Sequence, residues 1–221
     1  MRQRLLNIFD ILLGKFGARH WWPGETPLEI IVGAVLTQNT SWKNVEKAIT
    51  NLKDAGLLEL ASLYRTPDEV LAEKIRPSGY YNLKTVRLKN LLKVIYEEYN
   101  ASIEYCKTLE LSQLRQRLLA IKGIGEETAD SILLYALGKP IFVIDAYTRR
   151  FLANHGLHEG RCTYGQAQDF FMSNLPADVY LFNEYHALIV ALGQTYCFKV
   201  PKCGECPLRS DKDKVRSEGL L

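Results

Sequence analysis

Residues 118–130, LLAIKGIGEETAD, decide the fold because they join two helical patterns through two closely spaced glycines. An apolar helical run ends near Ile121, and a second helix begins directly after Gly123, Ile124 and Gly125. Glycine has no Cβ atom to obstruct a tight turn. Backbone N–H groups at the start of the second helix then point outward, where they can bind an anion such as a phosphate. The pattern predicts either a phosphate-binding hairpin or an ordinary turn between two helices.

Helical periodicity continues on both sides of this hairpin. Apolar residues form a helical stripe in residues 5–16, and TPLE at 26–29 and TPDE at 66–69 have the pattern of a capping box. Further helices are predicted over residues 42–54, 80–98, 110–121, 126–137, 146–155, 163–174 and 178–193. The run PIFVI at 140–144 is the only strand-like segment and is too isolated to build a sheet. We therefore expect an all-α fold.

The composition is ordinary for a soluble globular protein. The 221 residues are 47% apolar and 24% charged, and 28 Lys and Arg against 25 Asp and Glu leave a net charge of +3. This balance does not by itself indicate a nucleic-acid partner. No uncharged apolar run approaches the ~18 residues of a membrane span, and the N-terminus has the pattern of an amphipathic helix rather than a signal peptide. We expect a cytoplasmic protein with no membrane partner.

Four segments resemble, in chain order, the motifs of the helix-hairpin-helix (HhH-GPD) DNA glycosylases. GAVLTQNT at 33–40 resembles the family's helix that ends in a Gln loop, and RPSGYYNLK at 76–84 resembles its second DNA-probing loop. IKGIG at 121–125 resembles its hairpin, and VIDAYTRR at 143–150 resembles its catalytic segment. The general pattern resembles that of the endonuclease III family.

The resemblance implies two α-helical lobes with a DNA-binding cleft between them. A six-helix lobe over residues 22–138 carries the helix-hairpin-helix motif at about 110–137. Residues 1–21 and 139–221 form the second lobe, which ends in a cysteine loop at 197–206.

Asp145 directly precedes a predicted helix, where Asp is favoured as the N-cap. A helix N-terminus keeps a carboxylate ionised. An ionised carboxylate can stabilise the cationic sugar that forms as a base departs, and it can orient water. The resemblance implies that Asp145 has this catalytic role, which is compatible with capping.

Glu127 stands where lyase-competent members of the family carry a Lys. That Lys attacks the sugar and forms a Schiff base, whereas Glu cannot form an imine. Structurally, Glu126 and Glu127 can simply place charge on the helix dipole. The difference predicts a monofunctional glycosylase that uses water. Gly33 stands near the point where adenine-mismatch relatives carry a Glu, which argues against that subfamily.

The positions of the tryptophans indicate which class of damaged base the protein would act on. The sequence has three tryptophans, Trp21, Trp22 and Trp42; Pro23 follows the first two, and Trp42 follows the Gln38 loop. They are either ordinary core residues or walls of the base pocket, which the family builds at both places. Indole rings attract the positive charge of an alkylated purine. The combined motifs resemble the 3-methyladenine DNA glycosylase III subgroup, in which a Glu also replaces the Lys.

Other residues are predicted to contact DNA. Tyr80 lies where the family inserts a wedge into the duplex, and Gln38 lies where the family fills the gap left by an extruded base. Both could instead be ordinary loop residues. The full predicted set is Gln38, Asn39, Tyr80, Lys122, Gly123, Ile124, Gly125 and Arg149, with Lys84, Arg87, Lys89 and Arg150 adding a basic rim for phosphates.

Cys197, Cys203 and Cys206 have the spacing Cys-x5-Cys-x2-Cys. The endonuclease III family binds a [4Fe–4S] cluster at this place through Cys-x6-Cys-x2-Cys-x5-Cys, and its fourth ligand would fall here on Lys212. Iron–sulfur clusters normally use four thiolates. Three alternatives remain: a cluster with an unusual fourth ligand, a zinc site, or a loop without metal. The resemblance favours a cluster with a structural role.

These observations predict a monomeric base-excision-repair glycosylase. It would bind double-stranded DNA in the nucleoid and hydrolyse the N-glycosidic bond of damaged bases, with alkylated purines such as 3-methyladenine as substrates. One alternative is an endonuclease III-like pyrimidine-lesion glycosylase and AP lyase. Another is a non-catalytic module that binds damaged DNA, although an intact Asp145 argues against it.

Overall fold

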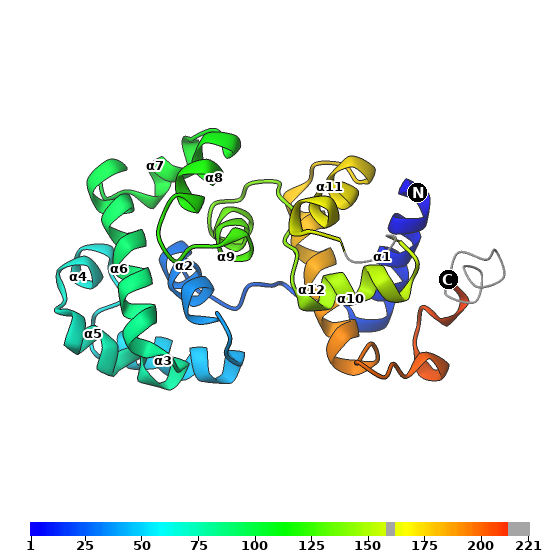
Figure 1. The fold of residues 1–221 in the computed structure, drawn as a ribbon, viewed down its shortest axis with the longest axis horizontal. Helices are drawn as coiled ribbons and strands as arrows, with labels where there is room; N and C mark the ends of the chain where they lie inside the picture. Colours follow the sequence, from blue (N-terminus) through cyan, green and yellow to red (C-terminus); the bar gives the residue numbers. More distant parts are fainter. Residues whose placement is uncertain (158–161, 212–221) are drawn as a thin grey trace. The chain divides into compact units, whose positions relative to one another are not determined.

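The computed structural model describes residues 1–157 and 162–211, and no strand occurs within them (Figure 1). This confirms the all-α prediction. The elements are α1 Arg2–Phe16, α2 Pro27–Leu36, α3 Trp42–Asp54, α4 Leu60–Arg65, α5 Asp68–Ile75, η1 Arg76–Ser78, α6 Tyr81–Glu98, α7 Ile103–Thr108, α8 Leu111–Leu119, α9 Glu126–Ser131, η2 Ile132–Ala136, α10 Ala146–Asn154, α11 Tyr164–Asn174, α12 Val179–Thr195 and η3 Cys203–Glu205. The helix predicted over 126–137 is an α-helix that continues as the π-helical turn η2.

The chain forms two compact units. One contains Met1–Trp21 and Pro140–Leu221, and the other is Trp22–Lys139. In the second unit, α2 lies in the core: its sequence PLEIIVGAVL is apolar apart from Glu29, and the helix is buried from Leu28 to Leu36 apart from Ile30. It packs against α3, α6 and η2, and this packing places the loop after α2 beside the hairpin of α8 and α9.

In the unit that contains both termini, α1 and α10 pack against the apolar helix α12 (Figure 1). The extended segment 140–144 is buried beside them, and the ring of Phe142 stacks on Phe171 at 4.0 Å. Its backbone is bonded by side chains instead of a sheet: Gln168 donates to the Phe142 carbonyl at 2.7 Å, and the Ile144 N–H donates to the Tyr164 hydroxyl at 3.3 Å. Residues 140–144 therefore have a strand-like sequence but form an extended connection that leads to α10.

Two predicted capping boxes are not formed. The Thr26 hydroxyl caps α2 by accepting from the Glu29 N–H at 3.2 Å, but the Glu29 carboxylate accepts from Glu25, one residue outside the box. The Thr66 hydroxyl turns back to the Ser62 carbonyl at the end of α4. A tertiary contact competes for Glu29, which also pairs with Lys53 at 3.0 Å, whereas a local bond to the preceding helix engages Thr66. None of the described helices is long and apolar enough to cross a membrane.

Candidate active site and nucleic-acid interface

The hairpin between α8 and α9 is closed by a hydrogen bond from the Ile124 N–H to the Ile121 carbonyl at 3.0 Å. Both isoleucine side chains are buried. Gly123 has φ +97°, and a Cβ atom there would overlap the side chain of Arg87. Gly125 has φ −94°, and a Cβ atom added there would have no neighbour within 4 Å. The turn therefore requires glycine at 123 for steric reasons, whereas position 125 is open toward its surroundings.

Gln38 follows α2 and is bonded to the hairpin. Its side-chain amide donates to the Gly123 carbonyl at 3.2 Å and to the Thr128 hydroxyl at 2.9 Å, and its Oε1 accepts from Arg87 at 2.5 Å. Arg87 is therefore used to fix the Gln loop against the hairpin. Asn39, directly after Gln38, is exposed with φ 52°.

Lys84 of α6 connects this region to the second loop. Its buried Nζ donates to the carbonyls of Leu36, at the end of α2, and Ser78, in η1, both at 2.7 Å. Burial lowers the pKa of Lys84 to about 8. The expectation that Lys84 belongs to a basic rim is therefore wrong. Lys89 is also turned inward, toward the carbonyls of Tyr64 and Thr66.

Tyr80 is presented by the loop that Lys84 anchors. It is 73% exposed and adopts φ 44°, a strained backbone conformation for a bulky residue. Strain of this kind persists where surrounding structure holds it in place, and here the Lys84 N–H bonds to the Tyr80 carbonyl at 2.9 Å.

Three aromatic rings meet at the N-terminal end of the same unit. The ring centroid of Trp22 lies 5.3 Å from that of Trp42, in an edge-to-face arrangement, and 5.3 Å from that of Tyr135 in η2. A Cβ at Gly33 would lie 3.2 Å from the Trp22 indole nitrogen, so glycine on α2 leaves room for this ring. The Trp42 indole donates to Glu46 at 2.8 Å. Trp21, at the end of the other unit, is half-buried and Pro23 is exposed. Sequence patterns do not indicate Tyr135 as a site residue, because it lies in an otherwise apolar run.

Asp145 is the N-cap of α10, as predicted. Its Oδ1 accepts from the N–H of Thr148 at 2.7 Å and from the Thr148 hydroxyl at 2.9 Å. Its Oδ2 lies 3.7 Å from Nε2 of His186 on α12. Burial acts to raise the pKa of Asp145, but the facing His186 and the bonds from Thr148 outweigh it and lower the pKa. The carboxylate is therefore ionised at neutral pH.

Residues 32–177 match the family model described as HhH-GPD superfamily base excision DNA repair protein. The chain belongs to this superfamily. It is 47% identical over 94% of both chains to a Methanocaldococcus jannaschii protein named, by inference, a DNA repair glycosylase. It is 27% identical to endonuclease III of Thermotoga maritima, over 87% of this chain and 85% of the relative.

Solved structures agree with this assignment. A Helicobacter pylori 3-methyladenine DNA glycosylase bound to 1,N6-ethenoadenine has a TM-score of 0.73 and 33% identity, over 87% of this chain and 95% of that one. An endonuclease III–DNA complex has a TM-score of 0.80 at 21% identity, over 99% of both chains, which shows a shared fold. The predicted family and fold are confirmed, and the chain is a DNA glycosylase of the HhH-GPD superfamily.

Within this HhH-GPD fold, Glu127 lies exposed in the first turn of α9, beside the hairpin. Lys122 and Arg149 are also exposed. Arg150 is not: it donates to the Cys197 carbonyl at 2.5 Å and lies over the Tyr147 ring at 5.0 Å. Its predicted place in a phosphate-binding rim is corrected, because this guanidinium fixes the start of the cysteine loop.

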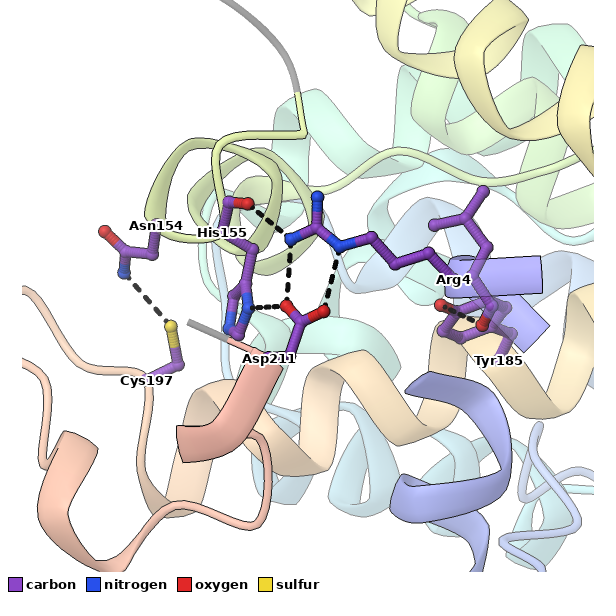
Figure 2. Close-up of polar contacts among 7 residues, drawn as sticks. Arg4, Asn154, His155, Tyr185, Cys197 and Asp211 are labelled. Atoms are coloured by element: carbon purple, nitrogen blue, oxygen red, sulfur yellow. Dashed lines mark hydrogen bonds and ion pairs between the residues drawn. The ribbon is translucent and has the colours of Figure 1, made fainter. Parts of the chain in front are cut away.

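Among the residues that the structure describes, the cysteine loop shows no complete ligand set for a cluster. Cys197, Cys203 and Cys206 line one small pocket that is partly open to solvent, together with residues such as Asn154 and His155. Within residues 1–157 and 162–211, no three His, Cys, Asp or Glu side chains are arranged to bind a metal ion. Cys197 Sγ instead accepts from Asn154 at 3.1 Å (Figure 2). Lys212, at the family's fourth ligand position, lies outside the described residues.

Asp211, one residue earlier, makes polar contacts to two other segments in this region (Figure 2). Its carboxylate binds the Arg4 guanidinium with two bonds of 2.8 and 2.9 Å and His155 Nδ1 at 2.9 Å. Arg4 also donates to the His155 carbonyl at 2.8 Å. The described side chains thus do not fit the four-thiolate set expected of a [4Fe–4S] cluster, and an ion-pair network joins α1, the end of α10 and the C-terminal segment.

Proposed function

We propose that this protein excises alkylated purines, such as 3-methyladenine, from duplex DNA by hydrolysis and leaves an intact abasic strand. The aromatic cluster of Trp22, Trp42 and Tyr135 carries the substrate assignment. Aromatic faces attract cations, and an alkylated purine is a cationic base that is already a good leaving group. The 33%-identical Helicobacter pylori enzyme, bound to a modified adenine, supports the same assignment.

In the proposed reaction the glycosidic bond breaks and the departing base takes the bonding electron pair, which neutralises it. Positive charge develops on the sugar, and Oδ2 of ionised Asp145 stabilises that charge. The oxygen of a water molecule then bonds to the sugar carbon, and the proton released passes to Asp145 or to solvent. Oδ1 keeps its bonds to Thr148 throughout, so the carboxylate remains oriented by α10.

We propose Gly125, Asn39 and Tyr80 as contacts to DNA. Space is open at Gly125, so a phosphate could approach the backbone N–H groups of the hairpin. Asn39 and Tyr80 project from two loops that Lys84 connects. For Gln38 to fill the gap left by an extruded base, its amide must exchange its bonds to Gly123 and Thr128 for bonds to the duplex.

The test is a panel of duplexes that each carry one lesion, assayed with and without alkali. We expect release of methylated purines, and strand breaks only after alkali. Asp145→Asn should abolish release while binding to abasic-site DNA persists, because the carboxylate acts on charge that develops in the transition state. Efficient release of oxidised pyrimidines with alkali-independent breaks would instead support the endonuclease III-like alternative. Normal excision by Asp145→Asn would overturn the mechanism.

The substrate assignment has its own test. Trp22→Ala and Trp42→Ala should reduce excision of methylated purines far more than binding to undamaged duplex, because phosphate contacts dominate non-specific affinity. Equal losses in the two assays would show that these rings act only as core residues.

A further inference from the structure

The two oxygens of the Asp145 carboxylate have different surroundings. Oδ1 accepts two hydrogen bonds from Thr148, which is the normal capacity of its lone pairs. Oδ2 is the oxygen left to act on the sugar, and His186 Nε2 faces it at 3.7 Å. This distance is too long for a hydrogen bond but short enough for a strong electrostatic interaction in a buried site. Contacts of this kind often tighten only when substrate binds.

His186 is held in place by the packing of α12. Its side chain is 7% exposed, and its chain neighbours Tyr185 and Ala187 are buried. Seven residues further along the same helix face, Gly193 lets the Tyr147 ring of α10 approach so closely that a Cβ there would overlap it. This close approach of α10 to α12 sets the separation of Asp145 from His186. A buried imidazole is costly to place unless it has a polar partner.

Charged groups on the neighbouring elements are either bonded to other groups or exposed. Glu184 of α12 accepts the N–H groups of Arg19 and His20 at 2.6 and 2.7 Å. On α10, Arg150 bonds to the Cys197 carbonyl, and Arg149 is exposed. On α1, Arg4 pairs with Asp211.

We propose that His186 is a positioning residue for the glycosylase reaction: its Nε2 orients Oδ2 of Asp145 and holds the carboxylate in its ionised form. This inference rests on the proposed function of Asp145. The imidazole takes no part in bond making or breaking. It acts by keeping negative charge on the one oxygen that α10 does not use.

The decisive variants are His186→Leu and His186→Gln. Leucine fills the space but removes the donor, so the single-turnover excision rate should fall roughly 10- to 100-fold, the range typical of losing the partner that orients a site residue. Affinity for abasic-site DNA should stay unchanged. Glutamine retains an N–H donor near the position of Nε2 and should restore most of the rate.

The fall of the excision rate at low pH, the acidic limb of the pH–rate profile, distinguishes a positioning role of His186 from a role in folding alone. Without His186, burial still acts on Asp145, so the pKa of Asp145 should rise and the limb should move to higher pH in His186→Leu but not in His186→Gln. His155→Leu is the matched control, because His155 is also a buried imidazole beside a carboxylate, that of Asp211. It should lower the melting temperature without moving the limb.

A titration of the Asp145 carboxyl by carbon NMR, without DNA, keeps this test independent of the substrate. A higher pKa in His186→Leu than in the wild type would support the proposal even if no alkylated purine were released. An unchanged pKa with a wild-type excision rate would overturn it. Loss of excision that tracks melting temperature alone, as in His155→Leu, would also overturn it.

Discussion

At the scale of single residues, the two glycines of the hairpin serve different ends. Gly123 adopts a left-handed conformation against Arg87, so the fold itself demands it. Gly125 has an extended backbone, and a Cβ atom there would have free space around it, so the fold does not require glycine at this position. A glycine at a position where a side chain would fit allows a ligand to approach the backbone closely.

Gly123→Ala and Gly125→Ala form a matched pair for measurement. Gly123→Ala should lower the free energy of unfolding by about 1–3 kcal/mol, since it combines left-handed strain with overlap of Arg87. Gly125→Ala should leave urea unfolding nearly unchanged but weaken binding to duplex DNA. If Gly125→Ala bound DNA like the wild type, the hairpin would not be the proposed phosphate contact.

The proposed lack of lyase activity rests on Glu127. With Glu in place of an amine, lesion DNA and borohydride should trap no covalent adduct with the wild-type protein, because a Schiff base needs a deprotonated amine. Electrophoresis under denaturing conditions measures this directly. A trapped adduct would show that another lysine, such as the exposed Lys122, attacks the sugar. Glu127→Lys, which puts an amine on the first turn of α9, provides the positive comparison.

At the scale of elements, Lys84 joins the end of α2 to η1 and so couples the two loops that carry Asn39 and Tyr80. Its folded pKa of about 8 lies below the ordinary value of 10.5. Between these values the unfolded chain binds more protons than the folded protein, so the contribution of Lys84 to stability rises with pH across that window.

Lys84→Met tests this linkage. The substitution leaves two buried carbonyls without their donor and should cost about 1–3 kcal/mol of stability. The difference in unfolding free energy between wild type and Lys84→Met should be larger near pH 10 than near pH 8. A difference that shrinks with pH would contradict the buried, partly neutral amine. Urea unfolding at both pH values supplies the measurement.

At the scale of the molecule, the network of Arg4, His155 and Asp211 joins segments that are far apart in the sequence (Figure 2). The Arg4 guanidinium and His155 hold the pKa of Asp211 far below its ordinary range, against the opposing effect of burial. The folded pKa is depressed, so the stabilisation is complete above the unfolded value of ~4 and is lost as pH falls toward the folded value.

Asp211→Asn should therefore destabilise the protein at pH 7 by about 2 kcal/mol, because it leaves the partly buried Arg4 without its charged partner. The difference in unfolding free energy between the variant and the wild type should become smaller in strong acid. Arg2→Asn, on the exposed face of α1, is the control and should have little effect.

An iron or zinc chelator should leave the wild-type melting temperature unchanged if these contacts alone hold the loop. A large drop would show that metal stabilises it.

Local patterns in the sequence were enough to predict the features that depend on residues close in the chain. Helical periodicity located α3 at Trp42–Asp54 and predicted most of the other helices to within about two residues. Asp145 was identified as an N-cap from its place before a helix, and the hairpin from two glycines. These depend on interactions between residues close in the chain, which a sequence displays directly.

Which side chains meet across the chain depends on tertiary packing and could not be predicted from local patterns. His186 faces Asp145 from 41 residues away, Gln38 bonds to Gly123 across 85, and Lys84 is buried although its charge suggested the surface. No periodicity or motif marks such pairs. They arise because packing of an apolar core brings helices together, and each buried polar group must then bind the partner it meets there.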